Sequence, residues 1–248
     1  MKSPMKSQVK PQKIRGLILR EYDAGESDKR LEILAKGHGR LWVYARGARK
    51  HTSKFLHGAQ SFTYADFVVN QGRGFHALSQ VEIIESFYPL REDYDRLMAA
   101  YQIVQACHQT LWDNIESDDL LLLVLVSLQA LAKGQIPPLQ VLGVFFMRFF
   151  DVFGLRPGLS HCAVCDTPAS HIPKAAFCDE GLVCYQHKPL AYAPISPGAL
   201  AALGHMLDSG LKQAFLFNAS TTVLGEIKKA WEVLWQVHFE KSPIYDKM

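Results

Sequence analysis

Two different periodicities of apolar and polar residues divide the chain. From Lys13 to Glu85, apolar and polar residues alternate over short runs that end in turn-forming residues, which is typical of β-strands buried on one face. After Pro89 the apolar residues recur at three- and four-residue steps, as they do along one face of an α-helix. The pattern predicts an α+β protein with an N-terminal β-domain followed by a helical domain.

Five strands are expected in the β-domain. The turn-forming residues 23–27, 37–39 and 71–74 separate consecutive runs. Five short strands in about 75 residues fit a small closed barrel of the OB type, although an SH3-like barrel or an open sheet would give a similar pattern. The expected strands cover residues 14–21, 29–35, 40–46, 61–70 and 75–85.

Five helices are expected after the β-domain. Ser117-Asp118-Asp119 offers an N-cap for the second helix, and Pro137-Pro138 begins the third. Gly134 and Gly154 are suitable stops for these two helices. The expected helices cover residues 91–113, 120–132, 138–153 and 199–207, with a last one that is capped by Thr221 or Thr222 and runs to Val237.

Four of the five cysteines lie in one segment that interrupts the helical pattern. Cys162-x2-Cys165 and Cys184-x2-His187 form two ligand pairs separated by eighteen residues, a spacing typical of a loop that wraps a tetrahedral zinc ion. Zinc accepts thiolate and imidazole ligands alike, and four protein ligands leave no coordination position for a substrate. The sequence therefore predicts one structural zinc ion.

The choice of ligands leaves alternatives open. Cys178 is the next best ligand and could displace His187, and His161 and His171 are also close in the sequence. Cys107 lies outside this segment, on the apolar face of the first helix, and is expected to be a small buried residue.

Disulfide or redox chemistry would be other uses of these cysteines. A disulfide framework suits small secreted chains, but residues 1–6 contain no apolar signal region. A thioredoxin-like Cys-x-x-Cys would open a helix after a strand, whereas Cys162 follows the loop residues 156–160. Zinc is therefore favoured over redox-active or unmetallated thiols.

Charge is distributed unevenly along the chain. Residues 1–85 hold fifteen Lys and Arg against eight Asp and Glu, a net charge of +7, whereas the remainder has a net charge of −4. A basic first third suggests contact with a polyanion, and ordinary surface charge is the alternative.

No apolar run reaches the roughly 18 residues that cross a membrane, so a cytoplasmic protein is expected. Residues 1–12 are expected to be a disordered tail.

A basic loop is expected between the third and fourth strands. Residues 46–54 contain Arg46, Arg49, Lys50 and Lys54 with small residues and no acid. Such a sequence predicts a flexible loop that can follow a phosphate backbone.

Aromatic residues are expected on the strands beside this loop. Trp42, Tyr44 and either Tyr64 or Phe67 could stack on bases, as aromatic residues do in OB folds that bind single strands. The alternative is that these rings fill the barrel core. Because Trp42 and Tyr44 alternate with apolar residues, they share one face of their strand.

No catalytic motif is apparent. The glycine pairs at residues 37–39 and 72–74 lack the strand-turn-helix setting of nucleotide-binding loops. Zinc deaminases need Pro-Cys-x-x-Cys and an open metal position, whereas His161 precedes the first pair here. The acidic pair Asp118-Asp119 is explained as helix N-terminal charge. The sequence therefore predicts that the protein is not an enzyme.

The parts follow one another in an order that is similar to a known family. A basic barrel, a helical domain and a zinc module before the last helices resemble the RecO family of bacterial DNA-repair and recombination-mediator proteins. The resemblance extends from about Lys13 to about Phe239. Its motifs are Gly16-Leu17-Ile18-Leu19, residues 26–31, residues 39–49, and Phe153-Gly154-Leu155-Arg156-Pro157 leading into Cys162-x2-Cys165.

The resemblance implies an OB-fold barrel over residues 13–85, a helical domain over 86–160 and 191–241, and a zinc-finger insertion over 161–190. It implies a non-catalytic, nucleoid-associated protein that binds single- and double-stranded DNA. Such a protein anneals complementary strands coated by single-stranded-DNA-binding protein and helps to load RecA together with RecR. In this family the single-stranded-DNA-binding protein docks on the helical domain.

The resemblance also implies which residues lie at the DNA surface and at the metal site. In the family's metal site, a fourth cysteine is usual at the position that His187 occupies here. Carried over by position, the DNA surface includes Lys29, Arg30, Arg40, Arg46, Arg49, Lys50 and Lys54.

Two other functions would share these sequence features, namely a zinc-containing OB-fold RNA-binding or translation factor and a structural adaptor.

Overall fold

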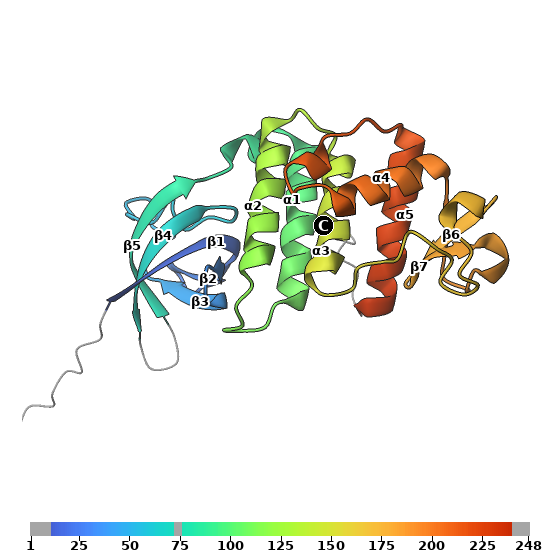
Figure 1. Cartoon of the computed structure of the whole chain (residues 1–248). Helices are drawn as coiled ribbons and strands as arrows, with labels where there is room; N and C mark the ends of the chain where they lie inside the picture. Colours follow the sequence, from blue (N-terminus) through green and yellow to red (C-terminus); the bar gives the residue numbers. More distant parts are fainter. Residues whose placement is uncertain (1–10, 72–75, 240–248) are drawn as a thin grey trace, which may run out of the picture. The chain divides into compact units, whose positions relative to one another are not determined.

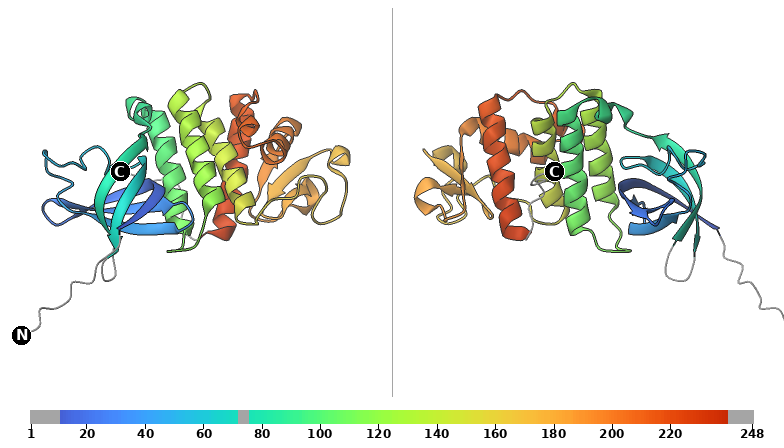
Figure 2. Two further views of the ribbon diagram at one scale, coloured as in Figure 1. Left: turned by 60° about the vertical axis from the view of Figure 1, so that its left-hand side comes forward. Right: turned by 180° about the vertical axis from the view of Figure 1, so that it is seen from behind.

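The computed structural model describes residues 11–71 and 76–239 and divides into two compact units (Figures 1 and 2). The first unit holds the described residues up to Phe87 together with Thr110–Leu121. The second holds Tyr88–Gln109 and the described residues from Leu122 onward. Residues 110–121, which were predicted to belong to the helical domain, therefore cluster with the barrel.

The first unit is a closed five-stranded barrel in the order β1-β2-β3-β5-β4 (Figure 1). Neighbouring strands are antiparallel except for a short parallel pairing between β3 and β5. The predicted OB-type barrel is confirmed, because an open sheet would not close between β1 and β4. The strands are β1 (Pro11–Ala24), β2 (Asp28–Ala35), β3 (Gly39–Ala45), β4 (Tyr64–Gln71) and β5 (His76–Glu85).

Three strand boundaries differ from the prediction by more than one residue, namely both ends of β1 and the start of β4. Pro11 and Gln12, which were expected in the tail, pair with β4, whereas residues 1–10 lie outside the described part. Residues 61–63 form a turn and not the start of β4, because Phe62 has a φ of 69° and its N–H donates to the Ile18 carbonyl at 2.8 Å. Of the turn expected at residues 71–74, Gln71 is the last residue of β4, and residues 72–74 lie outside the described part.

A cross-strand ion cluster joins β1 to β4. Arg15 donates two hydrogen bonds to the Asp66 carboxylate, at 2.7 and 2.8 Å, and the Lys13 ammonium lies 2.9 Å from it. The hydrogen bond from Arg15, with help from Lys13, holds the pKa of Asp66 well below its usual range. The native barrel therefore keeps Asp66 ionised at a pH where the unfolded chain protonates it.

We expect Asp66→Asn to lower the thermal stability of the barrel at neutral pH. Since the folded pKa of Asp66 is lowered, its stabilisation is present above the unfolded pKa and is lost as pH falls through the folded pKa. The difference in melting temperature between wild type and variant should therefore shrink below about pH 4. Glu82→Gln is the matched control, because Glu82 is exposed and lies 3.9 Å from Lys13. An equal difference at acid and neutral pH would contradict the assignment.

Five α-helices follow the barrel strands in the described part of the chain, as predicted, and they belong to the second unit except for Thr110 and residues 118–121. Gly134 and Gly154 end α2 and α3 with φ values of 65° and 73°, a conformation that favours glycine. The N-cap of α5 is Ser220, whose hydroxyl accepts a hydrogen bond from the Val223 N–H at 3.3 Å, so the prediction of Thr221 or Thr222 was wrong by one or two residues. The helices are α1 (Tyr94–Thr110), α2 (Asp118–Lys133), α3 (Pro138–Val152), α4 (Pro197–Asp208) and α5 (Thr221–His238).

The core of the second unit is centred on α3, which packs against α4 and α5. The Phe146 ring stacks on Trp231 with centroids 4.0 Å apart, and Cys107 is fully buried as predicted.

A small sheet packs on α5 through β6 and β8. Its strands are β6 (Ala175–Cys178), β7 (Gly181–Cys184) and β8 (Ala193–Ile195), in the order β7-β6-β8. Within the described residues, no helix is both long enough and apolar enough to span a membrane.

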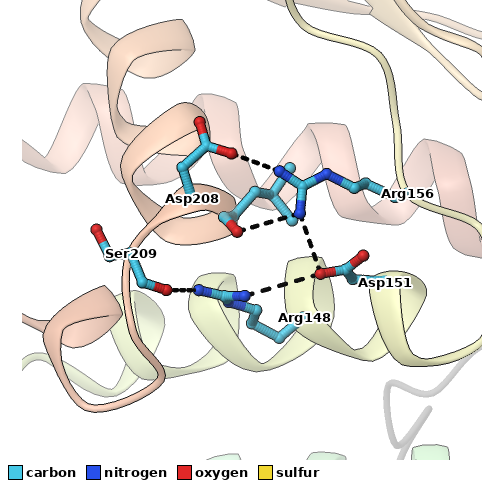
Figure 3. A network of polar contacts seen from close by, with 6 residues as sticks. Arg148, Asp151, Arg156, Asp208 and Ser209 are labelled. Carbon is cyan, nitrogen blue, oxygen red and sulfur yellow. Dashed lines mark hydrogen bonds and ion pairs between the residues drawn. The ribbon is translucent and has the colours of Figure 1, made fainter.

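Two arginines connect the ends of α3 and α4 just before the cysteine-rich segment (Figure 3). Arg156 donates to the Asp151 carboxylate and the Leu207 carbonyl, both at 3.2 Å, and also pairs with Asp208. Arg148 donates to the Ser209 carbonyl and lies 3.7 Å from Asp151. These contacts fix the position from which the chain leaves the helices.

Candidate nucleic-acid interface and metal centre

Aromatic and basic side chains lie together on the outer surface of β1, β2 and β3. Leu41, Val43 and Ala45 of β3 point into the core, so the alternating residues Trp42 and Tyr44 point outward. The strand register places Tyr22 opposite Arg30 and Arg30 opposite Tyr44. We call the outward residues Tyr22, Arg30, Trp42 and Tyr44 the aromatic face.

Neighbouring side chains hold the Trp42 ring in place. The Arg30 guanidinium carbon lies 3.9 Å from the centre of the ring, a cation–π contact. The centre of the Tyr22 ring lies 5.8 Å from that of Trp42. Trp42 and Tyr44 therefore do not fill the core. Phe67 does, because it is fully buried there, and Tyr64 lies on β4, which does not neighbour β3.

A buried carboxylate supports the aromatic face. Glu32 is opposite Trp42 in the register of β2 and β3 and is fully buried. The Tyr22 hydroxyl donates to Glu32 at 3.4 Å, and the Arg40 guanidinium lies 3.7 Å from Glu32 and 2.5 Å from Asp113. Arg40, predicted to contact DNA, is thus tied to two carboxylates. Glu32 was missed by the sequence analysis, because an acidic residue at an outward strand position is usually solvated.

Segment 110–121 is fastened to the start of β3. The Asn114 N–H donates to the Arg40 carbonyl at 3.1 Å, and Asp118 accepts from the Gly37 N–H at 2.7 Å. Gly39 has a φ of 67°, and a Cβ on it would lie 1.7 Å from the Ile115 carbonyl oxygen. The close approach requires a glycine at this position.

The basic loop is folded into turns, so the expectation of a flexible loop was wrong. Ala48 and Phe55 are buried in the barrel core. The Gly47 N–H donates to Asp28 at 2.7 Å, and this hydrogen bond lowers the pKa of the Asp28 carboxyl. Lys54 donates to the Ser79 carbonyl at 2.7 Å. The apolar residues point inward and leave the cations outside.

The predicted DNA-contacting cations fall into two groups. Lys29 pairs with Glu21 and donates to the Ala59 carbonyl at 3.2 Å, and Arg49 lies 3.2 Å from Asp23. These two, with Arg40 and Lys54, are engaged within the fold. Arg30, Arg46 and Lys50 are exposed, and none of these three forms an ion pair in the described part of the chain.

The two ligand pairs of the cysteine-rich segment converge. One ligand atom from each of Cys162, Cys165, Cys184 and His187 can be chosen so that all four lie within 4.8 Å of one another. The Cys165 and Cys184 sulfurs are 3.7 Å apart, and the Cys162 sulfur is 3.8 Å from His187 Nδ1. A tight turn that includes Asp166 at a φ of 56° brings the first pair together. Three sulfurs and one imidazole form a donor set suited to a tetrahedral metal ion.

Backbone N–H groups stabilise one thiolate of this cluster. Burial opposes ionisation of Cys162, but N–H groups, including the one from Cys184 at 3.3 Å, lower its pKa to about 6. Burial and the sulfurs of Cys165 and Cys162 raise the pKa of Cys184 to about 11. A full set of thiolates therefore needs a bound cation to balance its charge.

Cys178 is not part of the convergent cluster. It is 3% exposed and lies at the end of β6 opposite Gly181. Burial raises the pKa of the Cys178 thiol, which makes it an unreactive core residue. His161 and His171 are exposed and do not join the cluster either.

Comparisons with known proteins agree with this architecture. The family model of the recombination protein O N-terminal domain matches residues 7–87, and that of the C-terminal domain matches residues 91–246. The DNA repair protein RecO of Acetivibrio thermocellus is 30% identical over 232 residues, which cover 93% of this chain and 92% of the relative. The DNA repair protein RecO of Frankia casuarinae is 31% identical over 206 residues, 82% of this chain and 84% of the relative. The chain therefore belongs to the RecO family of DNA repair proteins.

Proposed function

We propose that the protein binds DNA through the aromatic face and the basic loop of its barrel and acts without catalysis as a recombination mediator. In this role it anneals complementary strands coated by single-stranded-DNA-binding protein and, together with RecR, helps to load RecA. The observation that carries the proposal is the outward Trp42 ring, which contacts Arg30 and Tyr22. Stacking on such rings and charge neutralisation are what a sequence-independent single-strand site requires.

We further propose that Cys162, Cys165, Cys184 and His187 hold one zinc ion with a structural role. Their convergence in a three-sulfur, one-nitrogen set supports zinc. Four protein ligands would leave no position for a substrate. The metal would therefore stabilise the module and take no part in DNA chemistry.

A mixing assay tests the proposed function. We expect the protein to accelerate annealing of two complementary oligonucleotides that are each coated with single-stranded-DNA-binding protein, and to bind single-stranded DNA less tightly as salt rises. Tight RNA binding without annealing would instead indicate an RNA-binding or translation factor. Nucleic-acid affinity that does not change with salt or on replacing Arg46 and Lys50 by alanine would indicate a structural adaptor.

A further inference from the structure

Two lysines and two tyrosines form a compact cluster on the metal-binding module, far along the chain from the barrel. The Lys174 and Lys188 ammonium nitrogens lie 3.8 and 4.4 Å from the centre of the same Tyr185 ring. Lys188 also lies 5.1 Å from the Tyr192 ring. The two tyrosine rings meet edge to face with centroids 6.0 Å apart. We call these four residues the lysine–tyrosine cluster.

The module fixes the positions of the two rings. The Tyr185 N–H donates to the Lys174 carbonyl at 2.9 Å, which continues the pairing of β6 with β7 by one step. Both rings pack against the small core that contains Cys162 and Val183. The rings are therefore anchored, and they hold the two ammonium groups on the surface by cation–π contacts.

The charges of this cluster are not balanced within the fold. Neither Lys174 nor Lys188 forms an ion pair with a carboxylate among the described residues, although Asp179 and Glu180 belong to the same module. Two like charges held at one ring repel each other, and an anion that bound close to both of them would relieve the repulsion. Two ammonium groups held at one ring act as point charges, which suit a phosphate.

We propose that the lysine–tyrosine cluster is a second nucleic-acid contact, which binds backbone phosphates of DNA without reading its sequence. The inference rests on the proposed function only in taking DNA as the polyanion. Ammonium groups act as point charges that suit phosphates in any sequence context. The chain would then hold DNA through both of its units, by stacking at the barrel and by charge at the module.

The test measures the salt dependence of binding by the full-length, zinc-loaded protein to a fluorescently labelled oligothymidylate. Each phosphate contact on single-stranded DNA adds about 0.7 to the slope of log affinity against log salt. Lys174→Gln/Lys188→Gln should therefore reduce the steepness of this slope by about 0.7 to 1.4. Lys212→Gln/Lys229→Gln removes the same charge from two exposed lysines elsewhere in the second unit and should leave the slope unchanged. Equal slopes for the two double variants would overturn the inference.

Further measurements distinguish a lost DNA contact from a loss of fold and from a site that binds an acidic protein segment. Metal content and melting temperature show whether the double variant keeps its fold. If the double variant does not fold, the test is repeated with Lys174→Gln alone, because Lys174 is not adjacent to a metal ligand. Tyr185→Phe should bind like wild type, whereas Tyr185→Leu should bind more weakly because the ring is lost. If the lysine variant lost affinity for polyglutamate but kept its affinity for DNA, the ligand would be an acidic protein segment and the inference would be wrong.

The Trp42 and lysine variants together distinguish a failure of the second contact from a failure of the proposed barrel site. A loss of affinity in Trp42→Ala with no loss in the lysine variant would leave the barrel as the DNA site and reject the second contact. The opposite result would reject the aromatic face and keep the lysine–tyrosine cluster.

Discussion

Replacing Cys165 with alanine is expected to abolish metal binding and to unfold the module of residues 161–195. Cys165 is exposed, so the substitution removes a ligand without opening a cavity in the core. One core cluster of the module contains four buried residues, Cys162, Ala176, Cys178 and Val183, and Phe177, Leu182, Ala193 and Ile195 are also buried. Structural zinc supplies of order 10 kcal/mol to zinc-finger peptides, so its loss should unfold a module with so few buried residues. Zinc per chain, measured by atomic absorption, should fall from about one to about zero.

Cys178→Ala is the matched control for this prediction, because it removes a thiol that lies outside the ligand cluster. It should keep its zinc, and it should lose some stability because Cys178 is buried. Hydrogen exchange should show lost protection over β6 and β7 in Cys165→Ala and unchanged protection in the barrel strands. Retention of zinc by Cys165→Ala, or its loss from Cys178→Ala, would reject the proposed ligand set.

The sequence was most informative where local rules decide the structure. The positions of Gly134 and Gly154 marked the ends of two helices because only a left-handed residue ends them in this way. The ligand spacing of Cys162, Cys165, Cys184 and His187 predicted a convergent cluster, since two-residue turns bring ligands together wherever they occur. Alternation in β3 also showed that Trp42 and Tyr44 share a face.

Contacts between residues far apart in the sequence could not be predicted from such local rules. Alternation left open which face of β3 turns inward, and closure of the barrel decided it by placing Leu41 and Val43 in the core. The attachment of residues 110–121 to the barrel includes the Arg40–Asp113 ion pair, which joins positions 73 residues apart. The basic loop seemed flexible because it is rich in small and charged residues, whereas buried Phe55 and Ala48 anchor it. The partners of Lys29 and Arg49 likewise became visible only in the folded chain.

Replacing Trp42 with alanine is expected to weaken binding to single-stranded DNA by about 5- to 150-fold. The range corresponds to the roughly 1 to 3 kcal/mol that base–aromatic stacking contributes per base. Trp42 is the best placed ring for stacking, since Arg30 and Tyr22 hold it outward on the aromatic face. Fluorescence anisotropy with a labelled oligothymidylate measures the change. The salt dependence should stay close to that of wild type, because the substitution removes a ring and no phosphate contact.

Two variants make this prediction specific. Trp42→Phe keeps an aromatic ring and should recover most of the lost affinity. Trp112→Ala removes another tryptophan of the same unit, which is 74% exposed but lies outside the aromatic face. It should bind DNA like wild type. If Trp42→Ala kept full affinity at an unchanged melting temperature, the aromatic face would not be a stacking surface. An equal loss in both alanine variants would mean that exposed tryptophans in general, and not the position on β3, determine binding.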